Sequence, residues 1–150
     1  MEILTKEYIF TDTNWEVNNY ENFLKSISLC EEQETLSKYT IQDLKEKNVI
    51  TYKSVSENIG FALKPDSLGF DMILLHNSSK IKGIIDNIIK YALSKGGNHC
   101  DYYETDKLKH IYSKYGFVEY QRDKFNMMYA DKNFNYKKYG TPDIVYVKLP

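Results

Sequence analysis

The chain has 150 residues, a hydrophobic share of 42%, a charged share of 27% and a formal net charge of −1 at pH 7. These values are typical of one soluble globular domain over residues 1–150, and they give no reason to expect nucleic acid as a partner. No apolar run reaches the roughly 18 residues of a membrane span. Two cysteines are too few for a disulfide framework, and the first residues lack a signal peptide. We therefore expect a cytoplasmic monomer or homodimer with no membrane partner.

Hydrophobic periodicity and turn residues predict strands and helices that alternate along the chain. The expected strands are 3–10, 49–55, 58–64, 70–75, 98–103, 117–122 and 144–149. The expected helices are 14–29 (capped by Asp12 or Thr13), 41–47 (capped by Thr40 and ended by Asn48), 81–94 and 108–115. This order indicates a mixed α/β sheet that is antiparallel in its early half. A parallel, right-handed strand–helix–strand crossover would follow over 70–103.

A short basic turn joins the strand at 70–75 to the helix at 81–94. The first N–H groups of a helix lack intrahelical partners, and with the positive end of the helix dipole they suit an anion. Lys80 and Lys82 would add attraction, and Gly83 would let a ligand approach the backbone. The alternative is an ordinary capped helix with solvated lysines.

A second motif, Tyr112-Ser113-Lys114-Tyr115-Gly116-Phe117, follows in the next helix. These two motifs, in this order of elements, resemble the GCN5-related N-acetyltransferase (GNAT) superfamily. The resemblance covers most of the chain from residue 3 and is most specific over 70–120. The family's later signature, a Tyr, three residues and then Gly-Phe, is matched in full.

The family's pyrophosphate loop reads Gln/Arg-x-x-Gly-x-Gly/Ala, and the matching run here is Lys80-Ile81-Lys82-Gly83-Ile84-Ile85. Gly83 matches, Lys80 is a basic substitute, and Ile85 departs from the final Gly/Ala. Thr105 is a second departure, because many relatives have Asn seven residues before the Tyr.

The resemblance implies a GNAT-like, mostly antiparallel central sheet flanked by helices, with the parallel β-α-β crossover at the cofactor site. It implies acetyl-CoA as co-substrate and no metal, with the pantetheine arm held between splayed central strands. The residues expected to contact acetyl-CoA are Leu75, His76, Lys80, Ile81, Lys82, Gly83, Ile84, Ile85, Thr105 and Tyr112. In the family, that Tyr commonly protonates the departing thiolate of coenzyme A, a task that suits a neutral phenol. The alternative for Tyr112 is packing, because it falls on the apolar stripe of its helix.

A base must take the proton of the attacking amine. The candidates on or beside the central strands are Asp71, Asp101, Glu104 and His76. Each has an ordinary alternative, which is a solvated or capping carboxylate or, for His76, hydrogen bonding within the turn. The expected catalytic set is Tyr112, Glu104 and Asp101.

His99 and Cys100 also invite a zinc interpretation. Adjacent strand residues point to opposite faces, so these two would not easily share a metal. We expect no metal site and a buried Cys100 thiol.

Residues 123–142 combine aromatic and lysine side chains without a regular pattern, a length that compact domains seldom leave idle. The segment could bind the acceptor, a protein or a nucleic acid, or its rings could simply cover the sheet.

The sequence therefore predicts an acyltransferase, an acetyl-CoA-dependent N-acetyltransferase that moves an acetyl group to an unidentified amine acceptor by direct attack. The alternative is a catalytically inactive GNAT-fold binding protein, encoded by a phage or mobile element and acting on a host protein or nucleic acid. The departures at Ile85 and Thr105 favour this alternative.

Overall fold

A computed structural model describes residues 15–30, 36, 38–55, 58–79, 83–128, 130 and 134–150. The strand expected at 3–10 and its neighbours Asp12 and Thr13 lie outside these residues. The described part forms a seven-stranded sheet in the order β1-β2-β3-β4-β5-β7-β6. β4 and β5 pair in parallel and the other neighbours pair antiparallel, so the predicted mixed sheet is confirmed.

The strands are β1 (Trp15–Val17), β2 (Ile50–Ser54), β3 (Ile59–Asp66), β4 (Gly69–Asn77), β5 (His99–Tyr103), β6 (Val118–Asp123) and β7 (Ile144–Lys148). The helices are α2 (Tyr20–Ser28), α3 (Ile41–Glu46), α4 (Ile85–Ser94), α5 (Asp106–Lys114) and α6 (Tyr136–Tyr139). None of these helices is long and apolar enough to cross a membrane.

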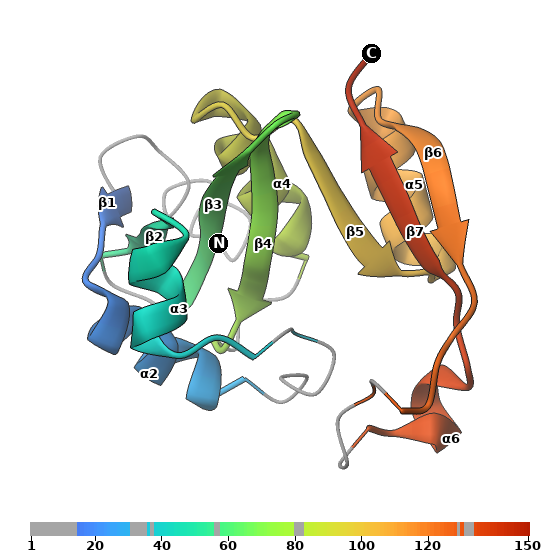
Figure 1. Ribbon diagram of the computed structural model, residues 1–150, viewed down its shortest axis with the longest axis horizontal. Coiled ribbons are helices and arrows are strands. Elements are labelled where there is room, and N and C mark those ends of the chain that lie inside the picture. Colours follow the sequence, from blue (N-terminus) through green and yellow to red (C-terminus); the bar gives the residue numbers. More distant parts are fainter. Residues whose placement is uncertain are drawn as a thin grey trace, which may run out of the picture.

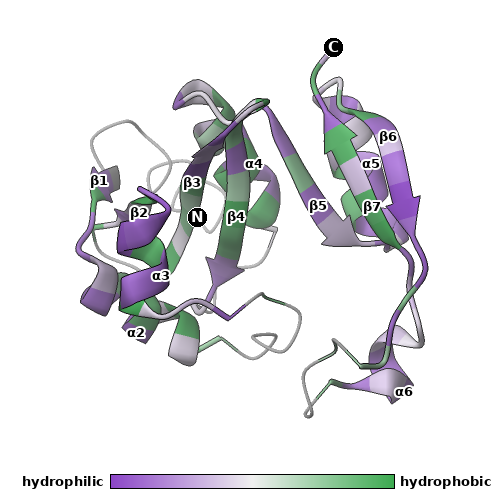
Figure 2. Ribbon diagram, viewed as in Figure 1, coloured by the Kyte–Doolittle hydropathy of each residue, from purple (hydrophilic) through white to green (hydrophobic). Residues whose placement is uncertain are grey.

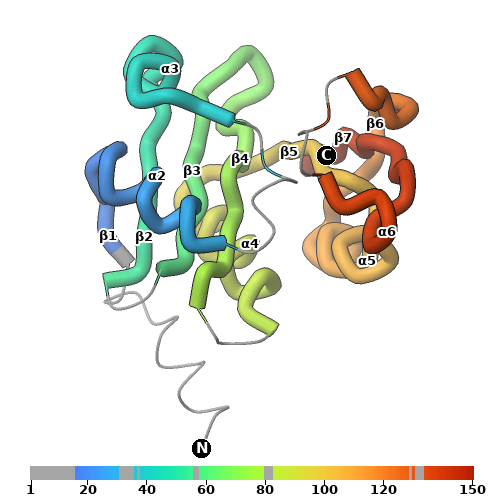
Figure 3. The backbone as a smooth tube through the Cα atoms, turned by 90° about the horizontal axis from the view of Figure 1, so that it is seen from below, coloured from blue at the N-terminus to red at the C-terminus, as the bar shows by residue number. Residues whose placement is uncertain are grey.

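Helices cover both faces of the sheet, α2 and α3 on one face and α4 and α5 on the other (Figures 1 and 3). Each face has its own core: Phe23 and Leu44 belong to the cluster under α2 and α3, and Ile88 and Ile111 to the larger cluster under α4 and α5. β3 and β4, which lie between the two cores, are largely hydrophobic, whereas the exposed edge strand β6 is largely hydrophilic (Figure 2). The buried centre of the sheet is therefore at β3 and β4, and β4 is one strand of the parallel pair.

Several local predictions are confirmed by capping geometry. Thr40 caps α3 in a capping box with Asp43, which closes two otherwise unpaired N–H groups. Asn48 then takes a left-handed φ of 54°, which ends that helical segment.

The first helix and α4 both begin later than expected. Residues 15–17 form β1 because they pair with β2, from Trp15 opposite Ser54 to Val17 opposite Tyr52, and α2 starts only after Asn19 caps it. α4 begins at Ile85 rather than at residue 81. In each case apolar residues at helical spacing also precede the first residue of the helix, so periodicity alone placed the start of the helix too early.

Candidate functional site

The parallel pair at the centre of the sheet is joined at only one position. Asp71 of β4 is opposite His99 of β5, and beyond this pair the two strands separate (Figure 1). β5 instead pairs along its whole length with β7. Among the residues that the structure describes, the facing edges of β4 after Asp71 and of β5 therefore have no ladder partner. Unpaired strand edges can accept hydrogen bonds from, and donate them to, an extended ligand that carries amide groups.

A bulge in β4 lies beside this separation. The register between β3 and β4 shifts between Gly60 and Ala62, so Leu74 and Leu75 together lie opposite Phe61. Leu74 has a left-handed φ of 55°, which is uncommon for a side chain of this size. Leu74 and the residue before it both pack under α2 and α3, whereas Leu75 packs on the α4 side. A bulge takes peptide groups out of the regular ladder, and such backbone strain concentrates at functional sites.

The N-terminus of α4 lacks a side-chain cap. α2, α3 and α5 are capped by the side-chain oxygens of Asn19, Thr40 and Thr105, but the N-cap residue of α4 is Ile84, whose aliphatic side chain accepts no hydrogen bond. The first bond of the α4 ladder runs from the N–H of Ile88 to the carbonyl of Ile84. The N–H groups of residues 84–87 therefore lie in the unpaired first turn, at the positive end of the helix dipole.

Gly83 directly precedes this turn with a φ of 72°, a conformation that glycine adopts without strain. Because α4 begins at Ile85, the amides exposed by the helix start are those of 84–87 and not the predicted 81–85. Ile85 is the first helical residue and packs partly buried against the core. Lys80, Ile81 and Lys82 lie outside the described residues.

Asp86, in the first turn of α4, is bonded to the end of α5. Its carboxylate accepts hydrogen bonds from the Lys114 ammonium and the Tyr115 hydroxyl. Desolvation of Asp86 is outweighed by these two bonds, so its pKa lies below the usual value. The contact ties the two helices together and neutralises an acidic group next to the exposed amides.

Tyr112 is buried between β5 and the end of its own helix. Its side chain is 5% exposed, and its ring stacks on Tyr102 with centroids 4.7 Å apart and meets Phe117 edge-on at 5.4 Å. Its hydroxyl donates a hydrogen bond to the buried Cys100 thiol. Burial raises the pKa of Tyr112 well above 10. The phenol therefore stays neutral, packs in the core and is already a donor to a sulfur atom.

Other residues expected at the cofactor have clear structural partners. Thr105 caps α5 by accepting from the Leu108 N–H at 3.2 Å. His76 is 2% exposed on the α2 side of the sheet, where its Nε2 lies 2.8 Å from the Ser26 hydroxyl and its Nδ1 lies 2.9 Å from the Leu74 carbonyl. Burial lowers the pKa of His76 to about 4. These contacts make His76 a neutral packing residue next to the bulge.

The carboxylates expected as bases have different environments. Glu104 is held by Arg122 through two hydrogen bonds of 2.9 and 2.7 Å, which lower the pKa of Glu104. Asp101 is exposed, yet its surroundings desolvate the carboxylate and raise its pKa, with Lys64 opposing this effect. Of these two residues, only Asp101 has a pKa displaced in the direction that a base near neutral pH requires.

Asp71, which the sequence offered among several candidates, has the most perturbed carboxylate of this group. Burial raises the pKa of Asp71 from 3.8 to about 6, while the Lys64 ammonium lowers it and the charge of Asp101 raises it. One oxygen lies 3.4 Å from the Lys64 Nζ, and the other is buried without a hydrogen-bond partner among the described residues. Asp71 lies on β4 three residues before the bulge at Leu74, about 10 Å along the strand at 3.3 Å per residue.

A group of three side chains also has the spacing of metal ligands. Oxygen and nitrogen atoms of Asp66, Asp71 and His99 lie within 4.8 Å of one another. However, the two ring nitrogens of His99 already bond Asn98 and Asp66, and the Lys64 ammonium lies beside Asp71. Because both ring nitrogens of His99 are already bonded and the Lys64 cation lies beside Asp71, we assign no metal to this group.

The aromatic residues of 123–142 pack together. Phe134 is buried at the centre of this group and contacts Phe125, Tyr136 and Tyr139, with ring centroids 5.1–5.5 Å apart. Phe134 also meets Tyr103 at the end of β5. The rings therefore pack mainly on one another, beyond the end of β5 (Figure 1).

The sequence matches no protein-family model and no curated protein, but the structure is similar to solved acetyltransferases. Solved structures match over most of the chain, among them an IAA acetyltransferase from Bacillus cereus with a TM-score of 0.66 and 15% identity, covering 90% of this chain and 97% of that one. A Bacillus subtilis acetyltransferase in complex with CoA has a TM-score of 0.61 and 14% identity, covering 91% and 97%. A GNAT-family acetyltransferase from Streptococcus pneumoniae has a TM-score of 0.52 and 10% identity, covering 89% and 96%.

The chain has the GNAT fold. At these identities the likeness shows the fold alone. The bulge at Leu74 lies in β4 beside its separation from β5, and α4 is the next element in the chain after β4. The sequence did not predict the bulge, because a bulge leaves no mark in an apolar run. It named Asp71 only as one of several candidate bases, because a raised pKa depends on neighbours distant in the chain.

Proposed function

We propose that this protein is an acetyl-CoA-dependent N-acetyltransferase that moves the acetyl group to an amine by direct attack. The observation that carries the proposal is the separation of β4 and β5 beside a strained bulge, in a fold whose solved examples include an acetyltransferase in complex with CoA. Acetyl-CoA supplies the acetyl group as a thioester. The chain's own residues would bind the cofactor, polarise the thioester carbonyl and move the protons.

The binding role falls to backbone groups. The unpaired N–H groups of residues 84–87, with the dipole of α4, would hold the pyrophosphate, and Gly83 would allow its close approach. The facing edges of β4 and β5 would bond the amides of the pantetheine arm. Peptide groups released by the bulge at Leu74 would polarise the thioester carbonyl.

Asp71 is the proposed base. The attacking nitrogen forms a bond to the carbonyl carbon and must lose one proton, and Asp71 is too far from the bulge for direct contact. The proton would therefore reach Asp71 through water. With a pKa of about 6, Asp71 is ionised at neutral pH and is still basic enough to accept a proton.

Tyr112 is the proposed donor to the leaving sulfur. As the carbon–sulfur bond breaks, the sulfur gains negative charge, and the neutral phenol of Tyr112 would donate its hydrogen bond and then its proton to it. The hydroxyl would exchange its present sulfur partner, Cys100, for the leaving sulfur.

The test is a thiol-release assay with acetyl-CoA and a panel of amines, with the acetylated product identified by mass spectrometry. We expect amine-dependent thiol release, with Tyr112→Phe lowering kcat and leaving the KM for acetyl-CoA almost unchanged. Tyr120→Phe, which alters an exposed ring on β6, is the matched control. If acetyl-CoA binds but no amine is acetylated, the catalytic proposal is wrong and the binding-protein alternative takes its place.

A further inference from the structure

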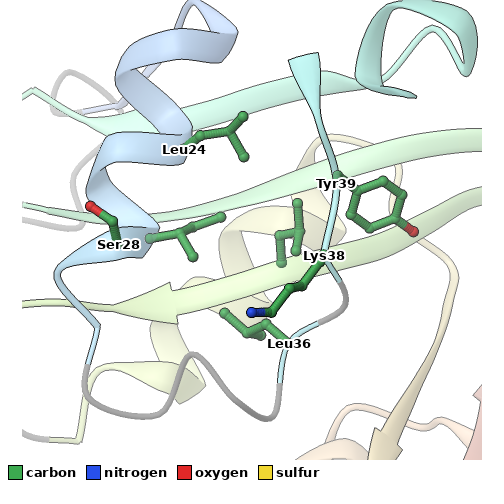
Figure 4. A pocket seen from close by; sticks show the side chains of 7 residues that line it. Leu24, Ser28, Leu36, Lys38 and Tyr39 are labelled. Carbon is green, nitrogen blue, oxygen red and sulfur yellow. The ribbon is translucent and has the colours of Figure 1, made fainter. Parts of the chain in front are cut away.

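A cavity of about 230 Å³ lies on the α2 side of the sheet, next to the bulge. Its apolar walls are Leu24 and Ile27 from α2, Leu36 from the segment that follows, and Leu74 from β4 (Figure 4). Leu74 is the strained residue of the bulge, so the cavity reaches the point where the thioester carbonyl would be polarised.

The opposite side of the cavity leads to the proposed base. Tyr39 lies at the edge of the cavity with its hydroxyl turned away from Leu24 and Ser28 (Figure 4). That hydroxyl accepts a hydrogen bond from the Lys64 ammonium, which is paired with Asp71. One side chain therefore borders the apolar cavity and also contacts the ion pair that contains the base.

The described lining of the cavity is mostly apolar. The described lining contains no carboxylate, and its one charged side chain is Lys38. A second ammonium group on the acceptor would enter an apolar space beside another cation, at a high desolvation cost. The volume is also below the 300–1,000 Å³ that is common for whole small-molecule sites, so it suits one branched or aromatic group.

We infer that the acceptor is a primary amine that carries one compact apolar group. The apolar group occupies the cavity between α2 and Leu74, and the nitrogen lies at the bulge, on the side from which its proton reaches Asp71 through water. This inference rests on the proposed function and names the class of its acceptor. A free alkylamine or arylalkylamine and a peptide that begins with a large apolar residue share this chemistry.

The experiment compares kcat/KM for isoamylamine, phenethylamine and a leucine-initiated tetrapeptide with the values for ethanolamine, spermidine and a serine-initiated tetrapeptide. A methylene in an apolar pocket commonly changes kcat/KM by 10-fold to 200-fold, so we expect each apolar acceptor to exceed its polar counterpart at least tenfold. If isoamylamine has the higher kcat/KM, the acceptor is a free amine; if the leucine peptide has it, the acceptor is the N-terminus of a peptide.

Leu36→Trp fills the cavity and provides a second measurement. It should lower kcat/KM for phenethylamine at least tenfold while changing the value for methylamine less than threefold. Leu68→Trp, at an exposed turn outside the cavity, should change neither. A merely structural role for Leu36 would lower both amines together.

Calorimetry with acetyl-CoA on the same samples separates the two possible failures. If acetyl-CoA does not bind, or if it binds and no amine is acetylated, the proposed function itself is wrong. If it binds and only polar amines are acetylated, if spermidine or ethanolamine is preferred, or if Leu36→Trp affects both amines alike, only the acceptor class is overturned.

Discussion

Replacing Asp71 with asparagine tests whether this carboxylate accepts the proton of the attacking amine. Removal of a general base commonly lowers a rate 10²-fold to 10⁴-fold, so we expect kcat of Asp71→Asn to fall at least a hundredfold. In the native protein a base with a pKa of about 6 gives a rate that rises with pH and levels off above 7. At pH 5 about a tenth of the base is ionised, and the rate should be about a tenth of its plateau.

Two neighbouring charges allow a sharper test, because they act on Asp71 in opposite directions. The Lys64 ammonium lowers the pKa of Asp71 and the Asp101 carboxylate raises it. Lys64→Met should therefore move the rising limb of the pH–rate profile to higher pH, and Asp101→Asn should move it to lower pH. Asp106→Asn, at an exposed site on α5, is the control. A limb that moves the same way in both variants, or an Asp71→Asn rate above half the native value, would refute the assignment.

Asp71 also has a readout that needs no acceptor. Its pKa is raised from 3.8 to about 6, so between these pH values the folded protein binds more protons than the unfolded chain. The stability that this group contributes is therefore full below 3.8 and is lost as the pH rises through 6. At 1.36 kcal/mol per unit the loss is about 3 kcal/mol. In urea titrations, the stability of Asp71→Asn relative to native should rise by up to this amount between pH 3.5 and 7, and a constant difference would contradict the raised pKa.

Three other predictions concern the elements around the site. Because Leu74 has a left-handed φ, Leu74→Gly should be at least as stable as Leu74→Ala in chemical unfolding, whereas in the regular strand β3 Leu63→Gly should be about 1 kcal/mol less stable than Leu63→Ala. His76 has a pKa lowered to about 4, so its contribution to stability is lost as the pH falls from 6.5 to 4; His76→Gln should remove about 3 kcal/mol of that acid sensitivity, measured as the difference from native. Thr105→Ala should lower the free energy of unfolding by about 1 kcal/mol, and Thr105→Asn, which keeps a capping oxygen, should not; equal losses would exclude the cap as the reason.

The elements that the sequence predicted well are those whose signals are local. The capping box of Thr40 and Asp43 and the glycine end of α4 at 96–97 involve residues a few positions apart, and the apolar stripe of α4 repeats at helical spacing. These interactions form within one segment, so the sequence carries them directly.

The features that the sequence missed depend on pairing between distant segments. β1 exists because residues 15–17 pair with residues 52–54, and this pairing overrode the helical spacing of the apolar residues. The bulge at Leu74 is a shift of register against β3, which an almost continuous apolar run does not reveal. Likewise, Glu104 is held by Arg122, eighteen residues later, and that contact decides its pKa.

In the candidate site too, local features were predicted and features that depend on distant segments were not. Gly83 and Tyr112 were predicted from their resemblance to two family motifs, and their role in the site stays a prediction. The environment of Asp71 required Lys64 on β3, Asp101 on β5 and the burial supplied by the surrounding sheet. A list of carboxylates on central strands therefore contained the proposed base but could not rank it.

Calorimetric titration of acetyl-CoA into the native chain and two glycine variants tests the central claim most directly. Gly83 and Gly116 both have a left-handed φ, of 72° and 89°, and a side chain at Gly116 would meet open space. Gly83→Glu and Gly116→Glu thus share the backbone strain and the added charge, but only the first lies at the start of α4. We predict micromolar binding to the native chain and to Gly116→Glu, and none to Gly83→Glu. Absence of binding to the native chain at millimolar acetyl-CoA, or undiminished binding to Gly83→Glu, would contradict the account.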